Sequence, residues 1–143
     1  MGQIVPYRIR PGDPTNSEKQ PWLVIYLAND PIPEWAIVDS GSTHSLLPPH
    51  VADRIGLAYD KTPKSGRGIS PFVYTLAVGT LNAKTEFGQA FVMDKIIVST
   101  YPGFALLGRR DFFETFFVAF DHRNRQFEID RQPPRMGFQA RTN

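Results

Sequence analysis

One acidic residue stands where an apolar segment runs into a turn of small polar residues. Trp35 to Val38 are four consecutive apolar residues of strand-forming type, and Asp39 follows them directly. A carboxylate at the end of a strand is costly to bury unless it is solvated or hydrogen-bonded, and Gly41 lets the backbone approach it closely. Such a group can act as a general acid or base. We expect its hydrogen bonds to come from the hydroxyls of Ser40, Ser42 and Ser45.

Two other chemistries are open to the residues of this turn. Ser42 or Ser45 could be a nucleophile with His44 or His50 as its base, but sequence neighbours seldom form such a pair and the chain has no Gly-x-Ser-x-Gly elbow. The sequence gives still less support for a metal site formed by His44, His50 and Asp53. We therefore expect neither a metal nor a cofactor. We expect His44 to fill a turn position and His50 to lie at an exposed helix start.

Composition limits the class of protein. The chain has 143 residues, of which 41% are hydrophobic and 21% charged, which fits one globular domain over residues 1–131 with a polar tail over 132–143. Eleven phenylalanines favour strands, and 13 prolines exclude a long helical bundle. We expect an all-β fold with one or two short helices.

The net charge and the lack of sorting signals restrict the kinds of partner and the compartment that we expect. A net charge of +2 without a basic helix argues against nucleic acid. The sequence has no cysteine, no pattern of a signal peptide and no apolar run long enough to span a bilayer. We therefore expect a cytoplasmic protein with no membrane partner.

Alternation and turn residues predict the elements. The sequence predicts an edge strand over 4–10 that is interrupted by Pro6, and a central strand over 21–28 that is apolar on both faces. Residues 79–82 read as a turn and 116–130 as a terminal hairpin. The other expected strands are 35–38, 72–78, 87–93, 96–98 and 105–108, and the expected short helices are 48–57 and 109–115.

The acidic turn resembles the active-site motif of the aspartic proteases. That motif is Asp-Thr/Ser-Gly-Ala/Ser with a Ser or Thr three residues on, matched here by Asp39 to Ser42 and Ser45. The segment Leu106-Leu107-Gly108 matches the family's later hydrophobic-hydrophobic-glycine segment, which crosses behind the active-site loop. The order of the elements is similar to that of the single-lobe, retropepsin-like members of bacteria and retroviruses, whose fold is a closed β-barrel.

The resemblance implies an endopeptidase that acts on peptide or protein substrates. Asp39 would be its catalytic residue, and Leu106, Leu107 and Phe72 would line apolar pockets. Because the chain holds one Asp-Ser-Gly motif and the mechanism needs two carboxylates, it also implies a homodimer. A flap over the substrate would contain Gly66, Arg67, Gly68, Ile69 and Phe72, although the residues alone fit a plain surface loop equally well.

Three departures from the family pattern stand out. Retroviral members carry Ala at the position of Ser42 and an acid at that of Thr43, and the acid commonly pairs with an arginine that corresponds to Arg109. Pro71 stiffens the return strand of the flap. The terminal hairpin is longer than a viral member needs, so a dimer interface built from chain ends, as in viral members, should not be assumed. A catalytically silent dimerisation or peptide-binding module is the alternative function.

Overall fold

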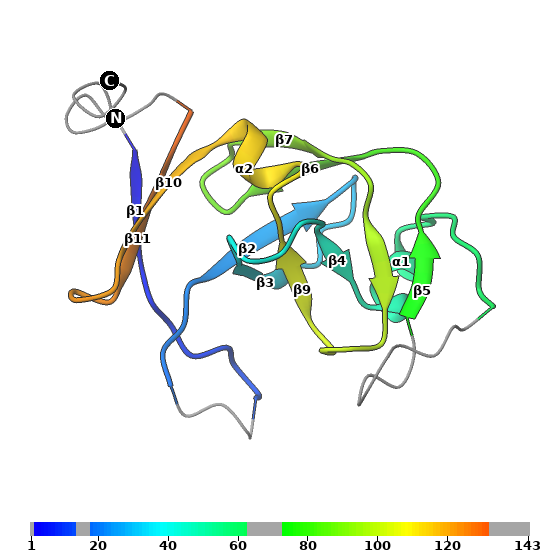
Figure 1. The fold of residues 1–143 in the computed structure, drawn as a ribbon, viewed down its shortest axis with the longest axis horizontal. Helices are drawn as coiled ribbons and strands as arrows, with labels where there is room; N and C mark the ends of the chain where they lie inside the picture. The colour runs from blue at the N-terminus through cyan, green and yellow to red at the C-terminus, as the bar shows by residue number, and fades with distance from the viewer. Residues whose placement is uncertain (1, 14–17, 63–72, 132–143) are drawn as a thin grey trace.

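Two β-sheets make up most of the molecule. The computed structural model describes residues 2–13, 18–62 and 73–131, and all structural statements below concern these residues. The larger sheet has eight strands in the order β5-β8-β4-β9-β3-β2-β6-β7, and the smaller has three in the order β1-β11-β10. The larger sheet curls into a half-barrel, with β5 and β7 at its edges (Figure 1). The expected mainly β fold is confirmed.

Strands β2 (Trp22–Leu27) and β3 (Glu34–Val38) lie inside the larger sheet. They pair antiparallel, and β2 also pairs with β6 (Leu81–Thr85). Five of the six side chains of β2 are buried, so the central strand predicted from its two apolar faces is confirmed. The strand β3 therefore ends at the boundary of a firmly packed core.

The remaining elements follow the order expected from the sequence, except that the two-residue strand β4 was not predicted. Proline begins the first helix, because its fixed φ and missing N–H suit the first helical turn. These elements are β4 (Leu46–Leu47), α1 (Pro49–Arg54), β5 (Val73–Leu76), β7 (Ala90–Met93), β8 (Ile97–Ser99), β9 (Ala105–Leu107) and α2 (Phe112–Thr115).

The first and last strands join the ends of the described chain. Strand β1 (Gln3–Pro6) pairs antiparallel with β11 (Gln126–Asp130), which also pairs with β10 (Phe117–Asp121). The terminal hairpin is thus confirmed, and β1 is an edge strand as Pro6 predicts. Phe127 and Ile129 attach this small sheet to the core.

Strand β6 also departs from expectation. Residues 81–85 form β6, whereas the sequence predicts a turn that reaches Asn82. Leu81, Ala83 and Thr85 are buried and the residues between them are exposed, so the alternation is present. Asn82 and Lys84 on the solvent face have low strand propensity and conceal it. No helix among the described residues has the length and apolar character needed to cross a bilayer.

Candidate active site

Asp39 directly follows β3, where that strand lies beside β9. The two strands run parallel, with Val38 opposite Leu107, and the backbone N–H of Asp39 donates to the carbonyl oxygen of Leu107 at 3.0 Å. Both neighbours of this bond, Val38 and Leu107, are buried. The backbone at Asp39 is therefore fixed by the core on one side, while its side chain is half-buried.

The turn after β3 holds the carboxylate through its own backbone. The N–H of Ser42 donates to the carbonyl oxygen of Asp39 at 3.1 Å, which closes the turn. The N–H of Gly41 donates to Oδ1 of the Asp39 carboxylate at 2.9 Å. One oxygen of the carboxylate is thereby oriented, and Ser40 and Gly41 lie exposed at the tip of the turn.

A later segment crosses directly against this turn. The N–H groups of Arg109 and Arg110 donate to the carbonyl oxygens of Ser42 and Thr43, each at 2.9 Å. A Cβ added to Gly108 would lie 2.5 Å from the carbonyl carbon and oxygen of His44, closer than atoms can pack. Only glycine fits there, which explains the glycine that ends the Leu-Leu-Gly segment.

The serine hydroxyls do not bond to Asp39, contrary to our expectation. Ser42 Oγ donates to the carbonyl oxygen of His44 at 2.6 Å. Ser45 Oγ donates to Oδ1 of Asp111 at 2.5 Å and accepts from the N–H of Gly108 at 3.0 Å. The Ser42 hydroxyl thus bonds within the turn, whereas the Ser45 hydroxyl fastens the turn to the crossing segment.

Asp111 is the residue that sequence reasoning missed. It is 3% exposed, and besides Ser45 it accepts hydrogen bonds from the N–H groups of Phe112 at 2.6 Å and Asp94 at 3.2 Å. Burial raises the pKa of Asp111, and these hydrogen bonds oppose that shift. Its place three residues after Gly108, at the start of α2, was the available signal, since Asp is a preferred residue before a helix.

Arg109 and His44 have neutral partners. The Arg109 guanidinium donates to Oγ1 of Thr43 at 3.0 Å, so the arginine meets a hydroxyl where an acid stands in retroviral members. The ring Nδ1 of His44 lies 3.0 Å from the carbonyl oxygen of Lys95. In the part of the chain that the structure describes, no group of three His, Cys, Asp or Glu side chains is placed to hold a metal ion.

The residues expected to contact the substrate are two leucines of β9 and the residues of the flap. Leu107 is fully buried in the core, so the expectation that it lines a substrate pocket is wrong, because its side chain packs inward beneath the turn. Leu106, on the other face of β9, is half-buried. The expected flap residues Gly66, Arg67, Gly68, Ile69 and Phe72 lie outside the described residues.

A hollow elsewhere on the molecule does not contain the acidic turn. It has a volume of about 740 Å³ and is lined by residues of β2, β6 and β7, such as Tyr26, Lys84 and Val92. Asp39 does not line it. In a single copy of the chain, the Asp39 carboxylate is thus half-buried outside this hollow.

Comparisons with known proteins agree with this geometry. A family model described as aspartyl protease matches residues 25–109, which is more than half of the chain and includes both the acidic turn and the Leu-Leu-Gly segment. The chain belongs to the aspartyl protease family. No curated protein matched the sequence.

The fold is that of a retropepsin-like protease. The crystal structure of a retropepsin-like aspartic protease from Rickettsia conorii matches this chain with a TM-score of 0.58 at 16% sequence identity. The match covers 90% of this chain and 90% of that chain. The resemblance found in the sequence is confirmed, and the retropepsin-like fold is present, although among the described residues the larger sheet is a half-barrel with β5 and β7 at its edges rather than the expected closed barrel.

Proposed function

We propose that the protein is an aspartic endopeptidase that acts as a homodimer. Asp39 of each copy would supply one of two carboxylates that together activate a water molecule. The observation that carries this proposal is the Asp39 carboxylate itself, which ends a core strand, has one oxygen oriented by the Gly41 N–H at 2.9 Å, and is half-buried. The family to which the chain belongs supports the same assignment.

The need for a second copy follows from the chemistry. Peptide hydrolysis without a metal or covalent intermediate needs one group to accept a proton from water and another to polarise the carbonyl. Two carboxylates about 3 Å apart share one proton, because both cannot ionise at that distance, and the pair can perform both roles. These 143 residues contain one Asp-Ser-Gly motif, and in this proposal the second carboxylate is Asp39 of a second copy.

The two Asp39 side chains would then take opposite roles in one turnover. The ionised Asp39 accepts a proton from water as the water oxygen bonds to the carbonyl carbon, while the protonated Asp39 donates its proton to the carbonyl oxygen. The tetrahedral intermediate collapses when its C–N bond breaks and the nitrogen takes up a proton from the pair. The backbone of Ser40, Gly41 and Ser42 holds each carboxylate for this exchange.

The substrate would be an extended peptide that lies across the two acidic turns. We propose that Gly66 to Ile69 close over it and that Leu106 and Phe72 contact its apolar side chains. Leu107 and Gly108 have a supporting role, since Leu107 accepts the hydrogen bond of the Asp39 N–H and Gly108 lets the crossing segment reach the turn.

The proposal is tested by measuring cleavage and association on the same samples. Sedimentation velocity across a wide concentration range gives the dimer fraction, and a peptide-library assay from mildly acidic to neutral pH gives the cleavage rate. We expect the rate per chain to follow the dimer fraction and to be lost on dilution. A strict monomer that binds a pepstatin-like transition-state mimic without cleaving any peptide would contradict the proposal and favour the silent peptide-binding module.

A further inference from the structure

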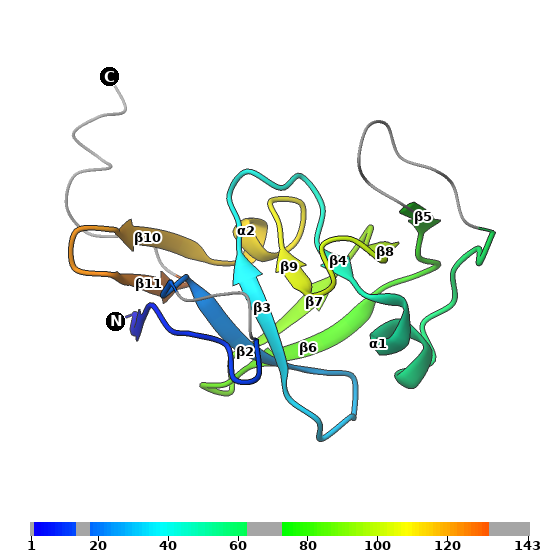
Figure 2. The same ribbon diagram turned by 90° about the horizontal axis from the view of Figure 1, so that it is seen from below.

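The hollow of about 740 Å³ lies beside strand β7, at one edge of the larger sheet and outside the proposed active site. Its volume is within the range of ligand-binding pockets. In Figure 1 strand β7 lies along the upper side of the molecule, with β6 and then β2 below it, and Figure 2 shows β6 and β7 side by side. The lining comes from these three strands, from the turn after β2, from α2 and from the residue after β11.

The register of the three strands places small, apolar and basic side chains on one solvent face. Tyr26 of β2 lies opposite Lys84 of β6, which in turn lies opposite Ala90 of β7. Asn82 lies opposite Val92 in the next exposed row. Val92 is 49% exposed and Tyr26 is 37% exposed. Because Ala90 is small, the side chain of Lys84 has room to extend over it toward the open edge of β7.

The backbone of β7 directs hydrogen-bonding groups away from the sheet. The N–H of Thr85 donates to the carbonyl oxygen of Gln89 at 2.9 Å, so these two residues form a hydrogen-bonded pair. Such pairs alternate with non-hydrogen-bonded ones along antiparallel strands, so Ala90 and Val92 point their N–H and C=O groups away from β6. The next outward N–H, that of Asp94, donates at 3.2 Å to the carboxylate of the residue before α2. Among the described residues, none bonds to Ala90 and Val92 on this side.

Strand β7 carries none of the features that commonly block an open edge. Its four residues, Ala90–Met93, include no proline and no charged residue. An exposed edge of this kind is a template for a further strand. The hollow therefore offers both a face and an edge to an extended peptide.

Two cations line the hollow without a carboxylate partner. In the described part of the chain, Lys84 forms no ion pair, and the guanidinium of Arg131 lies 4.9 Å over the ring of Phe116 rather than against an acid. Asp30 is the one acid among the described lining residues, and its carboxylate already accepts from Nε of Arg54 at 2.6 Å. A group that enters the hollow therefore meets uncompensated positive charge.

We propose that an acidic, extended segment of a partner protein adds a strand to β7 and places its carboxylates against Lys84 and Arg131. Backbone hydrogen bonds to Ala90 and Val92 align the segment, as in other cases where a peptide extends a sheet. Charge-assisted bonds from the lysine and the arginine select for acidic side chains. This site is independent of the proposed function, since it requires neither the Asp39 carboxylate nor a dimer.

Charge argues against the two occupants that the chain itself could supply. A second copy that paired through its own β7 would bring Lys84 and Arg131 of both copies to one interface, where like charges repel. The sequence after Arg131 contains two arginines, Arg135 and Arg141, and no acidic side chain, so it would add positive charge as well. An acidic segment of another protein supplies the charge that both of these lack.

Binding of a synthetic peptide tests the proposal. The probe is a fluorescently labelled peptide of seven residues in which valine and glutamate alternate, and its anisotropy is followed as full-length Asp39→Asn protein is added. This substitution prevents cleavage under the proposed mechanism, so the experiment reads binding alone. We expect saturable binding that weakens as salt rises, because the contacts are between charges. The matched peptide with lysine in place of glutamate should bind at least about tenfold more weakly.

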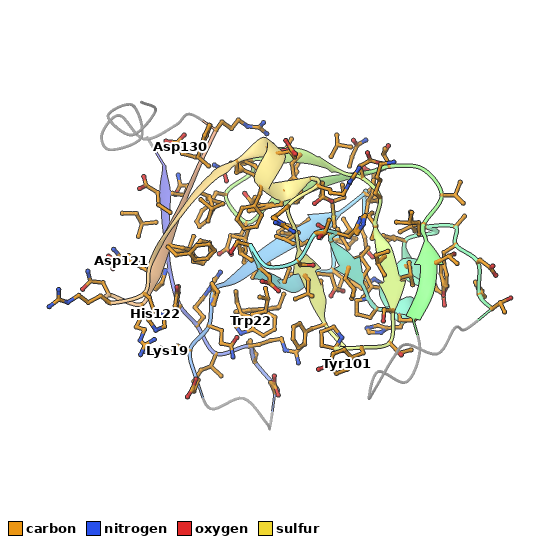
Figure 3. All side chains as sticks on the ribbon, viewed as in Figure 1. Lys19, Trp22, Tyr101, Asp121, His122 and Asp130 are labelled. Carbon is orange, nitrogen blue, oxygen red and sulfur yellow. The ribbon has the colours of Figure 1, made fainter. Side chains whose placement is uncertain are left out.

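Charge reversal in the hollow provides the matched variants. Lys84→Glu and Arg131→Glu should each weaken binding of the glutamate peptide at least about tenfold. Lys19→Glu makes the same change of net charge at an exposed residue that does not line the hollow and lies on the lower side of Figure 3, and it should weaken binding less than about twofold. The double variant Lys84→Glu/Arg131→Glu should prefer the lysine peptide, a reversal that loss of the fold would not produce.

Methylated peptides test the strand pairing itself. In an added strand, every second N–H points to β7 and the others point to solvent. One peptide is N-methylated on its valine amides and another on its glutamate amides, so the donors to β7 are removed from only one of the two. We expect one peptide to lose binding and the other to keep it. Equal loss in both peptides, or no loss in either, would overturn the addition of a strand.

The outcomes separate this site from the proposed function and from the other occupants. Selective binding of the glutamate peptide supports the β7 site whether or not the native protein cleaves peptides. Equal affinity for the glutamate and lysine peptides, or a Lys84→Glu affinity within about twofold of that of Lys19→Glu, would overturn the site and leave the protease standing. Displacement of the glutamate peptide by a synthetic copy of residues 132–143, or dissociation of dimers as the peptide binds, would assign β7 to the chain itself and overturn the proposal.

Discussion

The hydroxyl of Ser45 joins two segments that are far apart in the sequence by donating to the buried carboxylate of Asp111 at 2.5 Å. The same oxygen accepts the N–H of Gly108 at 3.0 Å, and the carboxylate accepts the N–H of Phe112 at 2.6 Å. The acidic turn is thereby fixed to the start of α2 without any contact to the Asp39 carboxylate. Ser45 and Asp111 are positioning residues, and their first effect should be on stability.

Ser45→Ala should lower the free energy of unfolding by about 2 kcal/mol. Ser45 is fully buried, so its removal leaves the Gly108 N–H without an acceptor and takes a donor from Asp111, and an unsatisfied buried group costs about 1 to 3 kcal/mol. Urea denaturation at one fixed protein concentration measures the change, because association alters apparent stability. Ser40→Ala in the exposed tip of the same turn is the control and should shift stability by less than about 0.5 kcal/mol. Equal losses in the two variants would contradict the role given to Ser45.

The carboxyl group of Asp111 should make stability fall as pH rises. Burial raises the pKa of Asp111 above its ordinary value of 3.8. At pH values between 3.8 and the raised pKa, the folded chain therefore holds a proton on Asp111 that the unfolded chain has released. The stabilisation from Asp111 is fully present below about pH 3.8 and is lost as pH rises through the raised pKa.

Asp111→Asn isolates this effect. The amide is neutral at every pH, and it also places an N–H₂ group against a backbone N–H, so the variant should be less stable throughout by about 1 to 3 kcal/mol. We expect the difference in unfolding free energy between the native protein and the variant to shrink as pH rises from 3.8. Asp30 and Asp121, whose pKa values are lowered by hydrogen bonds, contribute equally to both proteins and cancel. A difference that does not change with pH would contradict the raised pKa.

Two glycines of the site should respond differently to alanine. Gly108→Ala forces a Cβ to within 2.5 Å of the His44 backbone, which cannot rotate away, and should cost about 3 kcal/mol of unfolding free energy. At Gly41 the nearest atom to a Cβ is Asp39 Oδ1 at 3.2 Å, so Gly41→Ala should change stability by less than about 1 kcal/mol. Thermal denaturation of both variants measures the contrast. If Gly108→Ala were as stable as Gly41→Ala, the close crossing of the two segments would be wrong.

The sequence predicted those parts of the site whose signals are local, namely single strands and helices. The run from Trp35 to Val38 predicted a strand that ends at Asp39, and the proline at the start of α1 predicted that helix. These signals lie within a few residues of one another, so propensity and alternation are sufficient to find them.

The partners that depend on the crossing of distant segments were not predictable. Ser45 was assigned to Asp39, its neighbour in the sequence, whereas the structure gives it to Asp111, which is 66 positions later. Arg109 had no visible partner in the sequence and meets Thr43. In both cases the pairing depends on the register of β3, β4 and β9, which a single sequence does not contain.

Thr43→Asp should stabilise the protein by restoring a charged partner for Arg109. The Arg109 guanidinium lies 3.0 Å from Thr43 Oγ1 at an exposed site, where an ion pair contributes about 0.2 to 1 kcal/mol. The gain should decrease at high salt, because exposed charges are screened. Denaturation at low and high salt, repeated in the Arg109→Gln background, measures the contribution of this ion pair to the free energy of unfolding. A gain that persists in Arg109→Gln would show that the new carboxylate acts through another group.

Asp39→Asn should abolish peptide cleavage while leaving fold and association intact. The amide cannot accept a proton from water, and the loss should exceed about a thousandfold in rate. Stability should change little, because the side chain is half-buried and the Gly41 N–H can still donate to the amide oxygen. Asp53→Asn is the control: this carboxylate is exposed on helix α1, 14 positions after Asp39, and the variant should keep the full rate. Mixing native protein with excess Asp39→Asn sharpens the test: subunit exchange would place most native chains in dimers with one carboxylate and one amide, so activity should fall toward the fraction of native pairs. Activity that fell only in proportion to dilution would mean that a single Asp39 is sufficient, and the paired mechanism would be wrong.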